Sequence, residues 1–268
     1  MKSFEKRVKV LTNRKICGNY FELSFIDKDI SGCAAPGQFL MLKTAAGFSP
    51  LLRRPFSIHS CRGNSIKVLY EVKGPGSELV SRFRKGDNFE VVGPLGNGFP
   101  LPDKNSNGVI LVAGGMGVAP LVFLAQRLRN CGIRSLRAFI GASGKECVLC
   151  EKEFSVPGFK VAVSTDDGSR GKKGYVSLLL EEYLRGKQTQ GTLLYCCGPR
   201  PMLRAVAAVA AKYSISGYCS LEAHMACGIG ACMGCVIPVQ NSLMQPSYKR
   251  VCKDGPVFPL QEVVWEGI

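Results

Sequence analysis

The hydrophobic pattern of this chain changes near residue 102, and that change limits the folds it can adopt. Before this point, short apolar segments are separated by turns rich in Gly and Pro, at 20–26, 38–42, 51–58, 65–70 and 88–92. Such segments predict antiparallel strands, with one short helix around 78–83. A small closed antiparallel β-barrel is the most economical architecture for them.

After residue 102 the pattern is that of an α/β domain. Continuous apolar runs, suited to strands buried on both faces, alternate with segments of helical spacing. Strands are predicted at 109–113, 136–140, 159–163 and 193–197, and helices at 118–128, 175–185 and 200–213. This alternation predicts a parallel sheet, so the fold class is α+β multidomain. We expect three domains, at 1–102, 103–213 and 214–268.

Four cysteines dominate the last of these domains. Cys227, Cys232 and Cys235 are spaced C-x4-C-x2-C, and Cys252 follows after sixteen residues. This spacing is typical of four thiolates that hold a plant-type [2Fe–2S] cluster. The glycines between them allow the backbone to curl around a cluster and to direct N–H groups at its sulfurs. A segment this small also needs a cross-link to fold stably, and a metal cluster supplies one.

Other uses of four cysteines match the pattern less well. A structural zinc site stays open as an alternative and would make the chain a non-enzymatic scaffold, although zinc sites usually combine two C-x2-C pairs. A Rieske centre needs two histidine ligands, and His59 and His224 are far apart in the sequence. Disulfides require an oxidising compartment, which nothing at the N-terminus indicates.

Composition indicates a compartment and excludes some partners. The chain has 268 residues and thirteen cysteines, and no apolar stretch resembles an export signal or a membrane span, so we expect a cytoplasmic protein. Most of the nine cysteines outside the proposed cluster are expected to be small core residues. The net charge is +15, but Lys and Arg are scattered singly or in pairs, which argues against nucleic-acid binding. Acidic cofactors and an acidic partner surface explain the excess better.

A first candidate binding site lies in the barrel. Arg54 and Phe56 are expected on one face of a strand, with Ser57 on the other. A cation, an aromatic ring and a hydroxyl can meet a diphosphate, a ring system and a ring nitrogen of a cofactor. A surface Arg beside a core Phe is the alternative. The glycine turn at 73–77 favours the cofactor, because its N–H groups can meet a phosphate.

A second candidate site lies where predicted strands of the α/β domain end. A G-x-G-x-x-P turn at 115–120 stands between a strand and a helix, where glycine allows close approach to a diphosphate and proline suits the first helical turn. The segment 197–199 follows another strand, at the edge where open α/β sheets bind ligands. The acidic pair at 166–167 favours NAD over NADP, whereas Arg170, Lys172 and Lys173 could reverse that preference.

These motifs resemble those of the ferredoxin-reductase family, whose flavin motif is R-x-[Y/F]-S. The resemblance implies an FAD-binding site made of Arg54, Pro55, Phe56, Ser57, Glu71, Val72, Lys73, Gly76 and Ser77. It implies an NAD-binding site made of Gly115, Gly117, Pro120, Cys197, Gly198 and Pro199. The barrel would then be the FAD domain, the α/β unit the nicotinamide domain, and 214–268 the [2Fe–2S] subdomain.

Over essentially the whole chain, the domain order and the cysteine segment are similar to electron-transfer subunits of type B (NAD-linked) dihydroorotate dehydrogenases. The segment from 220 to 258 is the most discriminating part. This resemblance implies an oxidoreductase subunit of pyrimidine biosynthesis that passes electrons between NAD and a separate FMN-containing catalytic subunit, which oxidises dihydroorotate to orotate. It also implies a heterotetramer with two copies of each subunit, and no catalytic acid–base residue in this chain. NAD(P)H reductase subunits that serve ferredoxin, an electron-bifurcating complex or a sulfur-reducing complex share nearly all of these motifs and stay open.

Overall fold

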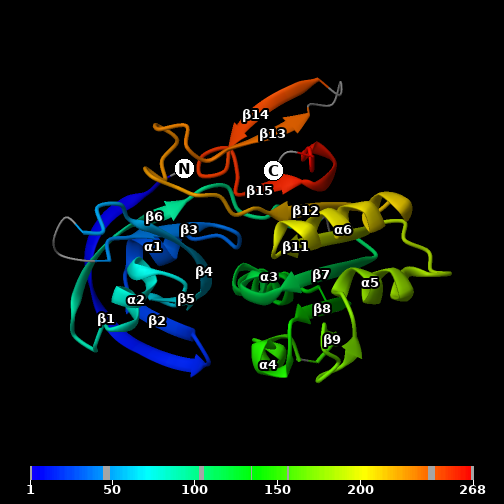
Figure 1. The fold of residues 1–268 in the computed structure, drawn as a ribbon, viewed down its shortest axis with the longest axis horizontal. Coiled ribbons are helices and arrows are strands. Elements are labelled where there is room, and N and C mark those ends of the chain that lie inside the picture. The colour runs from blue at the N-terminus through cyan, green and yellow to red at the C-terminus, as the bar shows by residue number, and fades with distance from the viewer. Residues whose placement is uncertain are drawn as a thin grey trace.

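The computed structural model describes residues 2–44, 49–102, 106–133, 135–155, 157–240 and 245–266. The first domain boundary predicted from sequence adjoins residues 103–105, which lie outside this range. The N-terminal part is a closed antiparallel barrel in the order β1-β2-β5-β4-β3-β6 (Figure 1). Its strands are β1 (Phe4–Cys17), β2 (Tyr20–Ile26), β3 (Phe39–Leu42), β4 (Arg54–Arg62), β5 (Ser65–Glu71) and β6 (Asn88–Leu95). The predicted barrel is therefore confirmed.

Two short helices cover the barrel. Helix α1 (Lys28–Cys33) was not predicted, since six residues are too few to show helical periodicity. It begins because the Asp27 carboxylate accepts hydrogen bonds from the N–H groups of Asp29 and Ile30. Helix α2 (Pro75–Ser81) starts three residues earlier than expected, with proline in its first turn.

The second part is built on a seven-stranded sheet in the order β10-β9-β8-β7-β11-β12-β15. All neighbours in it are parallel except β12 and β15, which are antiparallel. The strands are β7 (Gly108–Gly114), β8 (Leu136–Ala142), β9 (Phe159–Thr165), β10 (Lys172–Lys173), β11 (Thr192–Cys197), β12 (Ser216–Ser220) and β15 (Val257–Pro259). The helices are α3 (Val118–Asn130), α4 (Glu151–Phe154), α5 (Val176–Leu184) and α6 (Arg200–Lys212), with single 3-10 turns η1 (Gly115–Gly117), η2 (Lys145–Cys147) and η3 (Leu260–Glu262).

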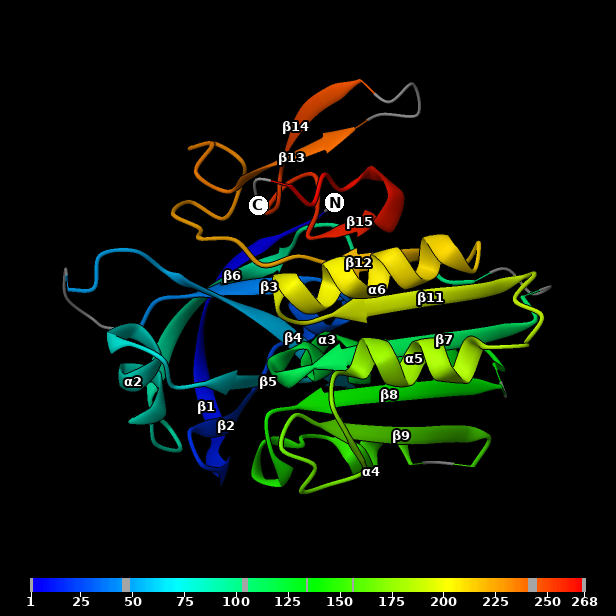
Figure 2. The ribbon, with the colours of Figure 1, turned by 45° about the vertical axis from the view of Figure 1, so that its right-hand side comes forward.

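Helices cover both faces of this sheet. Alternate residues of β7 point to opposite sides: Ile110 and Val112 pack with α5 and α6, whereas Val109 and Leu111 pack with α3. Figure 2 shows α5 and α6 in front of the sheet and α3 behind it. The continuous apolar runs of the sequence are thus explained by burial on both faces.

The C-terminal segment shares this sheet. Strands β12 and β15 both come from the predicted domain 214–268, yet they extend the sheet of the α/β unit. Between them lie the cysteine segment and a separate hairpin of β13 (Val236–Gln240) and β14 (Pro246–Arg250). The division at residue 213 therefore falls within a continuous sheet.

Helix α3 joins the barrel to the α/β unit. Phe123 of α3 belongs to the barrel's hydrophobic core. His59 of β4 is buried, and its Nδ1 lies 3.2 Å from the carbonyl oxygen of Ala119, so Nδ1 is the protonated nitrogen that donates this hydrogen bond. Burial lowers the pKa of His59 below its ordinary value, although the bond to Ala119 opposes that shift.

This buried histidine predicts a pH-dependent stability. Because the pKa of His59 is lower in the folded chain, the unfolded chain binds a proton that the folded chain does not. The free energy of unfolding should fall as the pH drops below about 6.5, and His59→Gln should lose that component. Urea unfolding of the protein at several pH values between about 5 and 8 measures it. His224→Gln, at an exposed position, should keep the wild-type slope, and an unchanged slope in His59→Gln would contradict the assignment.

Of the nine cysteines outside the proposed cluster, Cys196, Cys197 and Cys219 are buried, and Cys17, Cys61 and Cys150 are partly buried and pack against the hydrophobic clusters. Most of the nine therefore contribute to the cores, although half of these six do so only in part. Among the described residues, none of the helices combines the length and the apolar character needed to cross a bilayer.

Candidate functional site

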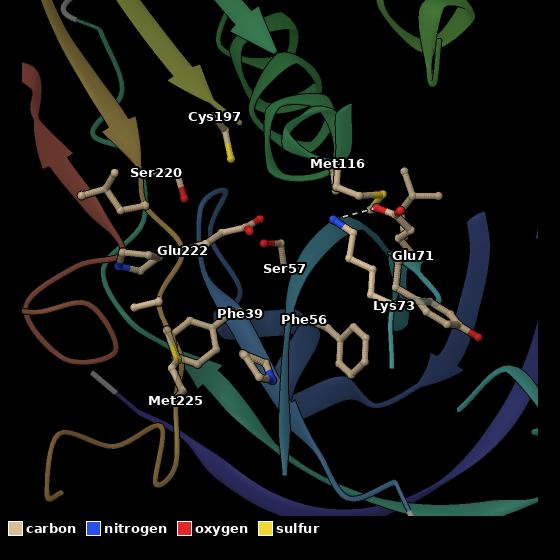
Figure 3. Close-up of a pocket in the computed structure, with 17 residues that line it drawn as sticks. Phe39, Phe56, Ser57, Glu71, Lys73, Met116, Cys197, Ser220, Glu222 and Met225 are labelled. Atoms are coloured by element: carbon tan, nitrogen blue, oxygen red, sulfur yellow. Dashed lines mark ion pairs between the residues drawn. The ribbon is translucent and has the colours of Figure 1, made fainter. Parts of the chain in front are cut away.

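Two adjoining cavities lie between the barrel and the α/β unit. The barrel-side cavity has a volume of about 250 Å³ and includes Phe56 and Ser57 of β4 together with Cys197 at the end of β11 (Figure 3). The sheet-side cavity has a volume of about 830 Å³ and is lined by the turns after β7 and β11. Glu71, Lys73, Met116 and Glu222 line both cavities. Together they have the size of a site for large cofactors.

On the barrel side, Phe56 and Ser57 border the same cavity although they are neighbours in sequence. The ring of Phe56 meets Tyr70 edge to face, with centroids 5.5 Å apart. Strand alternation still sends the two side chains to opposite faces of β4, so the cavity reaches around the strand to both. An aromatic ring and a hydroxyl thus line one space, as a flat heterocyclic ligand requires.

Arg54 lies beside the first turn of α2. A Cβ atom added to Gly76 would lie 2.9 Å from Nε of Arg54, so only glycine fits under this side chain without a shift. The Ser77 hydroxyl donates to the carbonyl of Gly74 and accepts from the N–H groups of Lys73 and Gly74. Four of the residues that the resemblance assigns to the FAD site line neither cavity: Arg54, Val72, Gly76 and Ser77. Their place next to a helix start suits a phosphate group.

On the α/β side, two glycine turns touch. A Cβ on Gly117 would overlap the carbonyl of Cys197 and would lie 2.7 Å from the nitrogen of Gly198. Gly115 has a φ of 50°, which disfavours other residues. Gly115, Gly117, Gly198 and Pro199 all line the sheet-side cavity, at the carboxyl ends of β7 and β11. Pro120 is buried inside α3 and lines neither cavity.

The far end of the sheet-side cavity reaches Asp166, just after β9. The neighbouring Asp167 is occupied locally, since its Oδ1 accepts hydrogen bonds from the N–H and the hydroxyl of Ser169. Three basic residues follow Asp167 in the sequence, Arg170, Lys172 and Lys173, and carboxylates bind the first two. Arg170 pairs with Glu151 at 2.8 Å, and Lys172 pairs with Glu182.

Glu222 is a site residue that was not predicted from the sequence. Its carboxylate lies at the junction of the two cavities (Figure 3). The side chain is exposed to the cavity, but the surrounding protein still desolvates it and raises its pKa, which nearby Lys73 and Arg200 partly oppose. The one sequence signal that could have indicated it is its position just after β12, at the start of the cysteine segment.

The four cysteines form two pairs. The N–H of Cys232 lies 3.4 Å from the sulfur of Cys227, and the N–H of Cys252 lies 3.4 Å from the sulfur of Cys235. A [2Fe–2S] cluster takes two thiolates at each of its two irons, so this arrangement fits it. In the part of the chain that is described, no three His, Cys, Asp or Glu side chains gather around a single-ion position.

The backbone around Cys227 stabilises a thiolate. Burial opposes ionisation, but the N–H groups of Cys232, Ile229 and Ala231 outweigh it and lower the pKa of Cys227 to about 6. Positive φ angles at Gly228 and Gly230 let the chain curl in this way. Such N–H groups are the ones that hydrogen-bond to cluster sulfurs.

The cysteine segment starts at the barrel-side cavity. Met225 lines that cavity, and Cys227 is two residues further along, so their Cα atoms are at most about 7 Å apart. Cys235 and Cys252 belong to the same hydrophobic cluster as Phe39 and Met41 of β3. Cys232, in contrast, is exposed. A group held by the four sulfurs would therefore lie between the cavity and the protein surface.

Two family models match this chain. Residues 222–264 match the iron–sulfur cluster binding domain of dihydroorotate dehydrogenase B. Residues 111–208 match an oxidoreductase NAD-binding domain. The first match contains all four paired cysteines, and the second contains both glycine turns.

Whole-chain comparisons agree with these matches. A solved structure of an NADH-dependent reduced ferredoxin-NADP oxidoreductase is similar with a TM-score of 0.83 and 27% identity, over 97% of this chain and 90% of that one. A ferredoxin NADP+ reductase from Neisseria gonorrhoeae with bound FAD and NADP shares the fold, with a TM-score of 0.66 and 17% identity over 78% of this chain and 91% of that one. The dihydroorotate dehydrogenase B (NAD(+)) electron transfer subunit of Desulforamulus reducens is 40% identical over 96% of this chain and 97% of its own length. The chain therefore belongs to the family of electron transfer subunits of dihydroorotate dehydrogenase B.

Proposed function

We propose that this chain carries electrons between NAD and an FMN-containing catalytic subunit that oxidises dihydroorotate to orotate. The observation that carries the proposal is the unbroken order of sites: glycine turns, barrel-side cavity and paired cysteines lie next to one another. The near full-length similarity to the Desulforamulus reducens subunit supports the choice of partner reaction.

The residues divide by the group that each would hold. Phe56 and Ser57 would contact the flavin ring of FAD, and Arg54, Gly76 and Ser77 its diphosphate. The rest of the FAD site would consist of Pro55, Glu71, Val72 and Lys73. The turns at 115–120 and 197–199 would bind NAD, and the four cysteines the cluster. When bound, FAD exchanges two electrons with a nicotinamide and single electrons with a [2Fe–2S] cluster.

The protein's own contribution is orientation. The contact between the two glycine turns fixes the sheet-side cavity against the barrel-side cavity, so a nicotinamide and a flavin ring would face each other. Lys73 and Glu71, which line both cavities, form an ion pair 2.9 Å long where the cavities adjoin (Figure 3). Chemistry on dihydroorotate belongs to the partner subunit in this proposal.

The ion pairs near Asp166 support NAD rather than NADP. A 2′-phosphate would need free cations, and Glu151 and Glu182 hold Arg170 and Lys172, which leaves Lys173 as the one of these three cations without an ion pair among the described residues. The Asp166 carboxylate at the cavity end suits a ribose hydroxyl and repels a phosphate.

Releasing Arg170 should therefore weaken the preference for NADH. In Glu151→Gln, we expect the ratio of kcat/KM for NADPH to kcat/KM for NADH to rise by up to about fivefold, because an exposed ion pair is worth at most about 1 kcal/mol. NAD(P)H-dependent reduction of a dye by the purified protein measures both values. Glu153→Gln on the same helix is the control, since no ion pair is found for Glu153 in the described residues. An unchanged ratio in Glu151→Gln would refute this role of the pair.

The partner assembly is tested by reconstitution. We propose a cytoplasmic heterotetramer with two copies of each subunit, in which 1–102, 103–213 and 214–268 serve FAD, NAD and the cluster. The chain and an FMN-containing dihydroorotate dehydrogenase subunit should co-purify and catalyse dihydroorotate-dependent NAD+ reduction, with a mass from light scattering equal to two of each. Absence of both a complex and this activity would contradict the proposal.

A second candidate function rests on the structural similarity to the NADH-dependent reduced ferredoxin-NADP oxidoreductase. Under this alternative the chain would exchange electrons with ferredoxin. Rapid ferredoxin reduction by NADH, together with no dihydroorotate-linked activity in the reconstituted complex, would favour it.

A further inference from the structure

A third cavity lies at the opposite edge of the parallel sheet from the glycine turns. It has a volume of about 690 Å³ and is lined by the amino ends of β7, β8 and β9 and by the segment that follows α5. Seven residues of β7 separate it from the turn at Gly115, which corresponds to about 20 Å along an extended strand. This N-edge cavity is therefore distinct from the proposed redox sites.

Three basic side chains gather in the N-edge cavity. Arg137, Lys160 and Lys187 line it, and among the described residues no Asp or Glu lines it. Across the described residues, none of these three cations forms an ion pair. The nearby acids of α5 are engaged elsewhere, Glu181 with Lys212 and Glu182 with Lys172. A concave surface with charge of one sign concentrates counter-ions.

One aromatic ring holds two of the cations close together. The guanidinium of Arg137 lies over the Tyr183 ring at 4.2 Å, and Nζ of Lys187 lies 4.9 Å from the same ring centroid. Tyr183 is itself held against Phe139, at a centroid distance of 5.3 Å. This contact positions the guanidinium, whose N–H donors can make a bidentate contact with a phosphate. The two cations repel each other, and an anion between them would remove that cost.

The wall of the cavity is held in place by hydrogen bonds. The Asn107 amide donates to the carbonyl of Gln190, and the Thr189 hydroxyl donates to the carbonyl of Tyr213. The segment after α5 thus keeps a fixed position beside the strand ends. Neutral polar side chains complete the lining: Ser135, Gln188, Gln190 and Thr192.

We propose that the N-edge cavity binds a polyphosphate-bearing small molecule, such as a nucleoside triphosphate. Three unpaired cations match the charge of a di- or triphosphate better than that of a single phosphate. The volume exceeds that of an inorganic phosphate and suits a nucleotide-sized ligand. Neutral amides and hydroxyls around the cations supply further hydrogen bonds to such a ligand.

Calorimetric titration of the holoprotein tests this site. NAD+ is kept saturating, so that the dinucleotide site is already filled, and inorganic triphosphate and UTP are titrated separately. We expect one saturable site per chain, with affinity reduced about tenfold or more in Arg137→Gln and in Lys187→Gln. Arg137→Lys should recover only part of the affinity, because it keeps the charge but loses the planar fork. Tighter binding of UTP than of triphosphate would identify a nucleotide, and equal binding an inorganic polyphosphate.

Two controls make the result decisive. Arg129→Gln removes an exposed cation from α3, outside the cavity, and should bind as the wild type does. NADH-dependent flavin reduction should remain normal in every variant, which shows that each is folded. The proposal is overturned if the wild type shows no saturable binding, if Arg137→Gln and Lys187→Gln bind normally, or if Arg129→Gln is weakened equally, since that would indicate general charge attraction.

Discussion

In Cys232→Ser, the visible absorption of the cluster should disappear and dihydroorotate-dependent NAD+ reduction in the reconstituted complex should fall to background. Reduction of the bound flavin by NADH should persist, because none of the four cysteines of this segment lines either cavity. The reason is geometric: Cys232 is the paired partner of Cys227, and without its thiolate one iron loses half of its protein ligands. Anaerobic absorption spectra with and without NADH, together with the coupled assay, measure all three quantities.

Exposed cysteines elsewhere provide the control for this result. Cys33 in α1 is exposed and lies outside the cysteine segment, so Cys33→Ser should keep the spectrum and the activity. If Cys232→Ser retained a normal cluster spectrum, the ligand assignment would be wrong. A colourless wild-type protein that contains zinc would instead support the scaffold alternative.

Gly117→Ala should have the second largest effect. The added methyl group would overlap the Cys197 carbonyl, and both groups are backbone, so relief requires that the turn after β7 move away from the turn after β11. We expect a loss of about 1–3 kcal/mol or more in stability and a fall in NADH-dependent flavin reduction of about a hundredfold. Calorimetric unfolding and stopped-flow reduction by NADH measure the two effects.

Two other glycines separate the causes. Gly115→Ala meets no atom within 4 Å but must adopt a φ of 50°, so it should cost only about 1 kcal/mol. Gly32→Ala has open space and no positive φ, and it should behave as the wild type. NADH reduction at the normal rate in Gly117→Ala would show that contact between the turns is not required for nicotinamide binding.

The sequence predicted the elements whose signal is local. Barrel strands such as β2 and sheet strands such as β7 stood out, because their apolar pattern is set by burial on one or two faces. The long strand β1 gave little signal, since only Val8 and Val10 are buried along it. The three residues of β15 are recognisable only through their pairing with β12, which depends on contacts distant in sequence.

The residues of the candidate site likewise fall into those with a local sequence signal and those that depend on distant contacts. The cysteine spacing and the glycine turns were visible because their chemistry lies in a short segment. The place of Glu222 at the junction of two cavities could not be predicted, because the cavities meet only in the folded chain. Likewise, the pairing of Arg170 with Glu151 joins residues nineteen positions apart, so the sequence left the choice between NAD and NADP open.

The antiparallel pairing of β12 with β15 has a consequence for how electrons travel. The cysteine segment leaves the sheet at Ser220 and returns at Val257, its paired neighbour, and the N–H of Leu221 donates to the carbonyl of Pro256 at 2.9 Å. The segment is therefore a loop clamped at its base, unlike a carrier module on a flexible tether that swings between donor and acceptor. Tunnelling between flavin and cluster would occur over a fixed gap, and its rate should not depend on solvent viscosity.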